Sequence, residues 1–347
     1  MPEKTISDND IPTLKDVALY AGVSTATVSR CLNAPNRVSA RTRESVMAAV
    51  NALGYAPNFS AQALAAKRTN TFGAIVPTMR NAIFAEGLQA FQEELGAHGI
   101  TLLVASSSYR ADLEAEQIRA LVARGADGLL LIGHDRDPET YVFLEKRQIP
   151  YVVTWAHRAG SGRTSIGFDN ARAMANLTRE VIALGHRNLA LIAGERDRND
   201  RARDRAKGVT QAMRANGLDP ERLITLETPY IADAGARAFA QVLEHASPPT
   251  AVLCGNDVIA AGALRQAQKM GLRVPQDISI TGFDDIELAG LLHPGLTTVA
   301  VPHRDMGRGA ARALFDLCAG HPPGREVELD ASITWRASLG PAPGPPR

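Results

Sequence analysis

The sequence has few of the residues that build metal centres and disulfide frameworks. Its 347 residues include only three cysteines, Cys31, Cys254 and Cys318, which are too far apart to form a metal-spaced cluster. The eight histidines are scattered, and none belongs to an HExxH pattern. We therefore expect no metal and no cofactor, and thiols kept reduced in a cytoplasmic environment.

Long apolar stretches and catalytic signatures are also missing. No run of about eighteen apolar residues could cross a membrane. The polar start MPEKTISDNDIPT lacks the apolar segment of a secretory signal. The GxSxG, Walker A and GxGxxG patterns do not occur in the context that each requires. These absences predict a cytoplasmic protein with no membrane partner and no enzymatic activity.

Charge is unevenly spread along a chain whose net charge is only +1. Residues 12–70 hold seven basic and two acidic side chains, whereas residues 71–347 hold 30 basic and 32 acidic ones. A basic segment beside a near-neutral body indicates a part that meets a polyanion. Charge alone leaves a solvated surface as the alternative.

Residues 12–57 carry the signals of three short helices. Thr13, Ser24 and Ser39 are residue types that cap helix N-termini, and Gly54 suits a helix C-terminus. Apolar side chains recur at helical spacing between these caps. The predicted helices span residues 14–21, 25–33 and 40–53. Three short helices with a small residue in the first turn are typical of a helix-turn-helix.

From Thr71 onward, short apolar runs alternate with longer helical stretches. The runs are FGAIVP, ITLLVAS, GLLLIG, PYVVTW, SIGF, NLALIAG, TAVLCG and DISITGF. This alternation predicts parallel sheets in an α/β fold, and its length predicts two lobes. The late segments LTTVAVP and REVELDASITWR are expected to carry the chain back between the lobes.

Two long segments carry motifs in the order found in one protein family. They are TLKDVALYAGVSTATVSRCLNAPNRVSARTRESVMAAVNALGYAPNFSAQALAAKRTNTFGAIVP and GNDVIAAGALRQAQKMGLRVPQDISITGFDDIELAGLLHPGLTTVAVP. Through them, about residues 12–340 resemble the LacI/GalR (lactose/galactose repressor) family of bacterial transcriptional regulators. The resemblance implies an all-α helix-turn-helix headpiece, a hinge helix, and an α/β two-lobed periplasmic-binding-protein-like effector domain.

The domain boundaries expected from this resemblance are as follows. A disordered tail (1–11) precedes the helix-turn-helix domain (12–57), the hinge helix and linker (58–68), the effector-binding and dimerisation domain (69–340), and a second disordered tail (341–347). The N-lobe is expected to take about residues 69–168 and 300–325. The C-lobe is expected to take about residues 169–298 and 326–340.

The second predicted helix has the chemistry of a recognition helix. Arg30 can donate two hydrogen bonds to one guanine, and Thr25 and Ala26 are short enough for close base contacts. By resemblance, all three match base-reading positions, with a phosphate contact or a surface salt bridge as the alternative for Arg30. Hydroxyl groups suited to phosphate contacts are those of Thr13, Tyr20, Ser24, Thr27 and Ser29.

Residues 58–68 are expected to form a short hinge helix that Asn58 caps. Leu64 matches the leucine that family members wedge into the minor groove, and Ala61 and Lys67 match neighbouring contact positions. Packing of Leu64 against its dimer mate is the alternative, and the two roles coexist in the family. So short a helix is marginal by itself, so it is expected to order only when two copies meet on DNA.

Polar residues directly after predicted strands mark the expected ligand site between the lobes. By resemblance, Arg205, Asn256 and Asp284 match effector-contacting positions, and Asp169 follows the run SIGF. A lobe-stabilising ion pair is the alternative for Arg205 with Asp284. The expected aromatic contacts are Phe84, Trp155 and Tyr230, with core packing as the alternative for Trp155.

The run ERDRNDRARDR is unusually charged. Its arginines could favour an anionic effector such as a sugar acid, and a solvated helix face is the alternative. The leading hypothesis is a repressor whose homodimer binds double-stranded, pseudo-palindromic operator DNA. A small-molecule effector, a sugar or sugar derivative, would control that affinity. The competing hypothesis is a solute-binding protein for transport, against which residues 12–57 argue.

Overall fold

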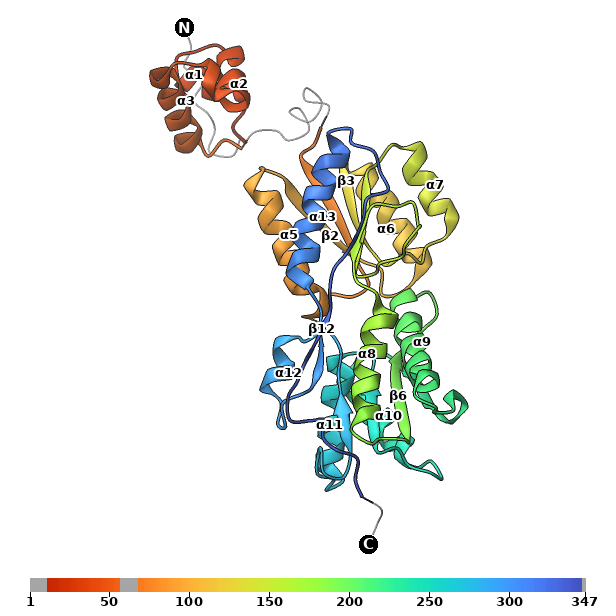
Figure 1. Ribbon diagram of the computed structural model, residues 1–347. Coiled ribbons are helices and arrows are strands. Elements are labelled where there is room, and N and C mark those ends of the chain that lie inside the picture. Colours follow the sequence, from red (N-terminus) through yellow and green to blue (C-terminus); the bar gives the residue numbers. More distant parts are fainter. Residues whose placement is uncertain (1–10, 57–67, 81, 345–347) are drawn as a thin grey trace. The chain divides into compact units, whose positions relative to one another are not determined.

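The computed structural model describes residues 11–56, 68–80 and 82–344. They belong to two compact units, Met1–Thr69 and Asn70–Arg347, called here the headpiece and the core (Figure 1). The expected hinge contacts Asn58, Ala61, Leu64 and Lys67 lie outside the described residues.

Local hydrogen bonds define where the headpiece helices begin and end. The helices are α1 (Leu14–Tyr20), α2 (Thr25–Asn33) and α3 (Ala40–Leu53), with a 3-10 turn, η1 (Pro35–Arg37), after α2. The Ser24 Oγ accepts from the Thr27 N–H at 3.2 Å, and Ser39 accepts from Thr42 in the same way at 3.3 Å. Gly54 ends α3 at φ +61°, which suits a residue without Cβ. Caps of this kind stabilise a helix by about 1 kcal/mol each.

The three headpiece helices share a small apolar centre. Val17, Val28 and Val46 come from α1, α2 and α3, and each is fully buried. Burial of a valine side chain contributes roughly 1.5–3 kcal/mol. The opposite face of α2 is thereby left to solvent.

The N-lobe of the core is a six-stranded parallel sheet in the order β11-β5-β4-β3-β1-β2. Its strands are β1 (Thr71–Val76), β2 (Thr101–Ser106), β3 (Gly128–Ile132), β4 (Tyr151–Thr154), β5 (Ser165–Gly167) and β11 (Glu326–Glu328). Its helices are η2 (Ala82–Phe84), α5 (Ala85–Ala97), α6 (Ala111–Ala123), α7 (Pro138–Lys146) and α13 (His303–Cys318). Strand β3 is apolar on both faces: Leu130 packs with the α5 and α13 cluster, and Leu129 and Leu131 pack with α6 and α7. Helices on both faces of the sheet require this pattern.

The C-lobe is a four-stranded parallel sheet in the order β7-β6-β8-β9. Its strands are β6 (Leu189–Gly194), β7 (Ile224–Thr228), β8 (Ala251–Cys254) and β9 (Ser279–Thr281). Its helices are α8 (Asn170–Ala183), α9 (Asp200–Ala215), η3 (Pro220–Arg222), α10 (Ala232–Leu243), α11 (Asp257–Lys269) and α12 (Glu287–Leu291). Along β6, Leu191 faces the cluster that includes α8 and α9, and Ile192 faces the cluster of α10 and α11.

The chain passes between the lobes three times (Figure 1). It leaves the N-lobe after β5, returns along β10 (Thr298–Ala300) into α13, and leaves again after β11 into β12 (Ser332–Thr334), which pairs with β10. The expected boundary put residues 326–328 in the C-lobe, whereas β11 pairs with β5 in the N-lobe sheet. None of the helices in the described ranges combines the length and apolarity needed to span a bilayer.

Two further features differ from the sequence expectation. Strand β7 was not among the predicted runs, because it is an edge strand whose residues ITLET mix polar and apolar side chains. The tail expected from residue 341 is partly ordered, since the Ala342 N–H donates to the Leu184 carbonyl at 2.9 Å. The buried side chain of Leu339 holds the preceding residues against the core.

Candidate DNA-binding and effector sites

The solvent face of α2 carries the predicted base-reading residues. Thr25, Ala26 and Arg30 are all exposed. The Arg30 guanidinium makes no hydrogen bond or ion pair with any residue that the structure describes, so its donors face solvent. This is the arrangement that major-groove reading requires of a recognition helix.

Of the hydroxyl groups predicted to contact phosphates, four form hydrogen bonds within the headpiece and one is exposed to solvent. Those of Ser24 and Thr27 hydrogen-bond each other at 2.9 Å, and Ser29 accepts from the Asn33 amide at 3.3 Å. The Thr13 hydroxyl donates to the Asp16 carboxylate at 2.6 Å. These side chains therefore also build the helix ends. Tyr20 is 63% exposed at the end of α1 and presents its phenol to solvent.

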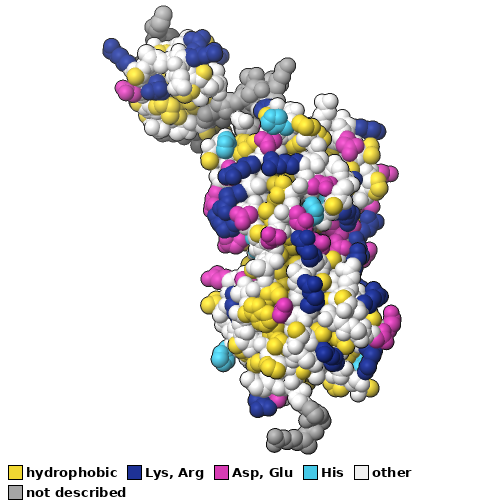
Figure 2. Space-filling model, in the orientation of Figure 1, with side chains coloured by type: hydrophobic (Ala, Val, Ile, Leu, Met, Phe, Trp, Pro, Cys, Tyr) yellow, Lys and Arg dark blue, Asp and Glu magenta, His cyan; other side chains and the backbone are white. Residues whose placement is uncertain are grey.

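On the face of the headpiece seen in Figure 2, basic side chains outnumber acidic ones and stand out at several separate places. The exposed basic side chains in its described part are Lys15, Arg30, Arg37, Arg41, Arg43 and Arg68. On the core, by contrast, Figure 2 shows basic and acidic side chains intermixed. The uneven charge of the sequence is thus also uneven on the folded surface, and the headpiece is the part suited to a phosphate backbone.

A cavity of about 270 Å³ opens between the two lobes of the core. The N-lobe contributes Thr78, Arg80, Ser108 and Tyr109, and the C-lobe contributes Glu195, Pro229, Tyr230 and Ile231. All eight residues lie in loops after β1, β2, β6 or β7. The loops after parallel strands converge at the carboxyl edge of a sheet, and ligands of such folds bind there.

Two tyrosines from opposite lobes stack in this cavity. The ring centroids of Tyr109 and Tyr230 are 5.5 Å apart, with an angle of 28° between the planes. The Asn199 amide donates to the Tyr230 hydroxyl at 3.2 Å. A Cβ on Gly194 would lie 2.0 Å from the Tyr230 ring, so only glycine allows the ring to lie there. Burial raises the pKa of Tyr109, and its phenol stays neutral.

Arg205 is buried at the C-lobe side of the cleft, and each of its three guanidinium nitrogens donates a hydrogen bond to a residue of this lobe. It donates to Asn170 Oδ1 at 2.9 Å, to the Gly255 carbonyl at 2.6 Å and to Asp284 Oδ1 at 3.3 Å. Its guanidinium also lies 3.8 Å from the centre of the Phe283 ring. The lobe-stabilising ion pair considered as an alternative is therefore present in the structure.

Two polar atoms near Arg205 lack such partners. Asp284 Oδ2 and Asn256 Nδ2 are buried, and neither has a hydrogen-bond partner among the described residues. Burial raises the pKa of Asp284, although Arg205 beside it acts in the opposite direction. Asn256 Oδ1 caps α11 by accepting from the Ile259 N–H at 2.9 Å. A buried polar group without a partner costs about 1–3 kcal/mol, so these atoms call for a partner.

The other predicted effector contacts are placed differently. Trp155 is 1% exposed, meets the Phe84 ring edge-on at 5.4 Å, and thus packs in the core. Phe84 is itself 4% exposed. Asp169 caps α8 by accepting from the Arg172 N–H at 2.9 Å. Of the predicted residues, Tyr230 lines the cavity. Arg205, in α9, instead contacts Gly255, which precedes Asn256, and Asp284, and these three predicted residues are not part of the cavity lining.

The charged run ERDRNDRARDR joins the lobes instead of forming a free cationic surface. Arg198 pairs with Asp137 of the N-lobe at 2.5 Å, and Arg203 pairs with Asp135. Asp200 accepts from the His134 N–H across the same gap at 2.6 Å. The positive charges that suggested an anionic effector are thus matched by carboxylates.

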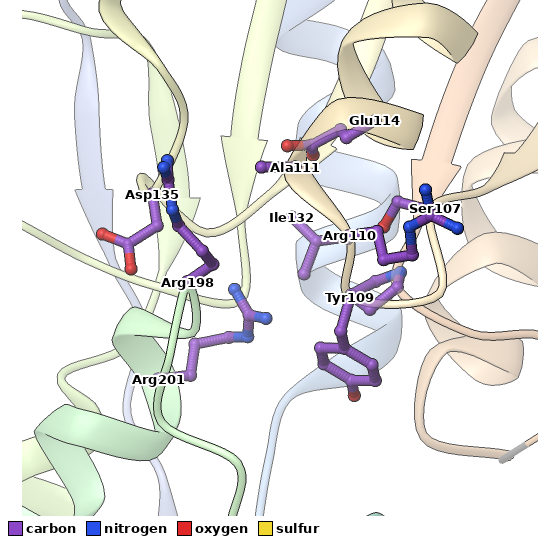
Figure 3. A pocket seen from close by; sticks show the side chains of 10 residues that line it. Ser107, Tyr109, Arg110, Ala111, Glu114, Ile132, Asp135, Arg198 and Arg201 are labelled. Carbon is purple, nitrogen blue, oxygen red and sulfur yellow. The ribbon is translucent and has the colours of Figure 1, made fainter.

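A smaller hollow lies beside the cavity, with a volume of about 20 Å³ (Figure 3). Figure 3 shows Tyr109 from the N-lobe and Arg201 from the C-lobe facing the same space. Arg201 is held by Asp200 at 2.9 Å. The hollow has room for little more than a water molecule. Across the described ranges, no three His, Cys, Asp or Glu side chains are grouped to hold a metal.

Known proteins match both the headpiece and the core of this chain. Residues 13–58 match the model of bacterial regulatory proteins of the lacI family, and residues 178–339 match that of a periplasmic binding protein-like domain. The HTH-type transcriptional repressor CytR of Escherichia coli (strain K12) is 34% identical over 328 residues, which cover 94% of this chain and 96% of CytR. This chain belongs to the lacI family. Its predicted fold class is confirmed, and it is a DNA-binding transcriptional regulator, not an enzyme.

Solved structures of lacI-family regulators extend the likeness to three dimensions. The lac repressor dimer bound to operator and the anti-inducer ONPF matches with a TM-score of 0.84 and 30% identity, covering 95% of this chain and 99% of that one. A complex of the transcriptional regulator CelR with cellobiose matches with a TM-score of 0.69 and 30% identity, covering 94% and 99%.

Several residues of the effector site were not among those predicted from sequence. Tyr109 and Ser108 follow the run ITLLVAS, and both have positive φ, +59° and +51°. Serine and tyrosine rarely adopt a positive φ, so the sequence pattern does not predict this backbone conformation at positions 108 and 109. Asn170 and His303 touch the predicted residues from the starts of α8 and α13, and only the packing of the lobes reveals them.

Proposed function

We propose that this regulator is a repressor whose operator affinity is controlled by a sugar or sugar derivative bound between the core lobes. The observation that carries the proposal is the pair of unpartnered buried atoms, Asp284 Oδ2 and Asn256 Nδ2. One is an acceptor and the other is a donor. A ligand hydroxyl, which both donates and accepts, can satisfy either one.

The cavity walls support a ring-shaped ligand of modest size. Tyr230 and Tyr109 offer aromatic surface, Pro229 and Ile231 offer apolar surface, and Thr78 adds a hydroxyl. A mostly apolar wall with a few polar groups is usual for small-molecule sites. The family member CelR is described in complex with cellobiose, a sugar.

Charge balance favours a neutral sugar over a sugar acid. The arginines of the run ERDRNDRARDR are paired with carboxylates, namely those of Glu227, Asp137, Asp200, Asp135 and Asp284. The cavity itself is lined by one cation, Arg80, and one anion, Glu195. An anionic ligand would therefore meet no surplus of positive charge there.

The headpiece supports major-groove reading by α2. We propose that Arg30 reads a guanine, that Thr25 and Ala26 make close base contacts, and that Thr13, Tyr20, Ser24, Thr27 and Ser29 contact the backbone. The minor-groove role proposed for Leu64, with contacts from Asn58, Ala61 and Lys67, concerns residues outside the described ranges.

We further propose that the protein acts as a homodimer, as the lac repressor does in its operator complex. The core has apolar side chains suited to a second copy. Val104 is 40% exposed on the edge strand β2, and Leu288 and Leu291 are 40% and 74% exposed on α12. Two copies would present two α2 helices to the two halves of a pseudo-palindromic site.

The test begins with selection of DNA sites from a random library by the full-length protein. Gel shifts at about 150 mM salt then compare the selected site with a scrambled one. D-glucose, D-gluconate and cellobiose are added in turn. We expect specific binding that a neutral sugar changes. Equal binding to both DNAs would overturn the regulator's specificity, and a response to gluconate alone would overturn the neutral-sugar assignment.

A further inference from the structure

Five buried residues form a closed ring of hydrogen bonds beneath the cleft, and two of the bonds are accepted by backbone carbonyls. Trp155 Nε1 donates to His303 Nδ1 at 3.1 Å, and His303 Nε2 lies 3.0 Å from the Asp284 carbonyl. Arg205 donates to Asp284 Oδ1 at 3.3 Å and to Asn170 Oδ1 at 2.9 Å. Asn170 Nδ2 closes the ring by donating to the Trp155 carbonyl at 3.0 Å.

The ring joins both lobes of the core. Trp155 follows β4 and His303 begins α13, both in the N-lobe. Asn170 begins α8, Arg205 lies in α9 and Asp284 follows β9, all in the C-lobe. Two passages of the chain between the lobes, β5 to α8 and β9 to α13, run through it. His303 and Asn170 each link Trp155 directly to the Arg205–Asp284 pair.

Hydrogen-bonding capacity determines the state of His303. An indole N–H only donates, so His303 Nδ1 must accept from it. The Asp284 carbonyl only accepts, so His303 Nε2 must carry the proton. The imidazole is thus neutral and both its nitrogens are used. Burial lowers the pKa of His303, which agrees with the neutral form.

The ring also holds two strained residues. Trp155 has φ +60° and Asp284 has φ +107°, in the region that side chains disfavour. Such residues persist only where several contacts hold them. The ring gives each of them two hydrogen bonds: Trp155 through its indole and carbonyl, and Asp284 through its carbonyl and carboxylate.

We propose that His303 and Asn170 are positioning residues of the effector site. His303 holds Asp284, and Asn170 holds Arg205, in the arrangement that receives the ligand. Both tie this pair to Trp155, so that a change at the C-lobe site alters the N-lobe. The assignment to ligand binding rests on the proposed function; the coupling between the lobes does not.

The chain offers a clean spectroscopic probe of the ring. It has only two tryptophans, buried Trp155 and Trp335, which is 52% exposed. In a Trp335→Phe background the single indole N–H signal in a ¹H–¹⁵N correlation spectrum belongs to Trp155. We expect it to be shifted downfield by the imidazole and slow to exchange with solvent.

Variants of His303 separate positioning from packing. His303→Phe keeps a ring but neither hydrogen bond, so the Trp155 signal should move upfield and exchange faster. His303→Gln keeps one acceptor and one donor and should restore both properties in large part. Equal spectra for wild type and His303→Phe, or equal damage from both substitutions, would overturn the role of His303.

Coupling is tested on the Arg205 Nε–H signal, identified as the one lost in Arg205→Lys. Trp155→Phe replaces the buried indole by a smaller phenyl ring and so removes the N–H donor. It should shift this signal, and Asn170→Ala should shift it further. Trp335→Phe is the matched control and should leave it unchanged. An Arg205 signal that does not move in Trp155→Phe would show that the two ends are independent, and would overturn the proposal.

Ligand binding is read separately, as the change in Tm of the full-length protein with D-glucose, D-gluconate or cellobiose. A sugar that raises the wild-type Tm should lose at least half of that shift in His303→Phe and Asn170→Ala, and keep most of it in His303→Gln. An undiminished shift in both would overturn their positioning role. If none of the three raises the wild-type Tm, the proposed sugar class fails while the spectra still decide the coupling.

Discussion

Arg30 of the headpiece and Arg205 of the core are the same residue in opposite surroundings. Arg30 is exposed on α2, and no described residue of the chain engages its guanidinium. Arg205 is 6% exposed and is bound by Asn170, Gly255 and Asp284. The donors of Arg30 are therefore available to an outside partner, whereas those of Arg205 already hold the fold together.

This difference separates two ways of using a cation for recognition. An exposed arginine contributes its full hydrogen-bonding capacity to a complex and little to stability. A buried arginine contributes to stability, and it influences a ligand mainly by where it holds its neighbour, here the Asp284 carboxylate. Substitution should consequently affect binding alone in the headpiece, and both folding and ligand response in the core.

The largest effect is expected from Arg205→Ala. Its loss leaves the buried Asp284 carboxylate and the Asn170 amide without their partner, which costs about 3–5 kcal/mol of unfolding free energy. Urea denaturation of the full-length protein measures this, and the response of DNA binding to sugar should also disappear. Arg214→Ala, at an exposed position of the same helix, is the control. A normal sugar response in Arg205→Ala would remove this residue from the effector site.

The next effect concerns pH and the contact between lobes at His134. Burial lowers the pKa of this 5% exposed side chain to about 4, below the ordinary 6.5. The unfolded chain therefore binds more protons between pH 6.5 and 4, and stability should fall as pH falls through this window, by up to about 3 kcal/mol. Unfolding free energies at several pH values should show a smaller slope for His134→Gln. An unchanged slope would mean that other groups cause the acid sensitivity.

A smaller effect, confined to DNA binding, is expected from Arg30→Ala. Loss of a bidentate contact to guanine should cost about 1–3 kcal/mol at one base position and leave the Tm unchanged. Gel shifts against the selected site and its single-base variants measure it. Arg43→Ala is the matched control, because Arg43 is exposed on α3, outside the recognition helix, and its loss should weaken binding to all sequences alike. Uniform weakening by Arg30→Ala would instead assign Arg30 to the backbone.

The smallest effect is expected at the exposed pair of Arg198 and Asp137. Each side chain is about half exposed, so their coupling should be below about 1 kcal/mol and should decrease with salt. A double-mutant cycle on the Tm measures it. The pair of Arg265 and Asp233 joins two helices within the C-lobe and serves as the comparison. A salt-independent coupling well above 1 kcal/mol would show that the bridge between the lobes is shielded from solvent.

Much of the architecture could be predicted from the sequence, and the exceptions share a cause. The headpiece helices and eight strands follow from caps, glycines and apolar runs, which are local signals. Strand β7 was missed because its pattern depends on which sheet edge it occupies. Trp155 was expected at the ligand, whereas it packs against His303, 148 positions away in sequence.

The sequence by itself determined that this protein has a DNA-binding headpiece and a two-lobed core, and that Arg30 faces outward on α2. The direction of Arg30 depends on residues three or four positions apart, whose geometry the helix dictates. The two lobes follow from the alternation of short apolar runs with longer helical stretches. Only the tertiary structure decided what Arg205 does. Its partners at positions 170, 255 and 284 come from separate elements, and a buried cation takes its role from whichever groups the fold places around it.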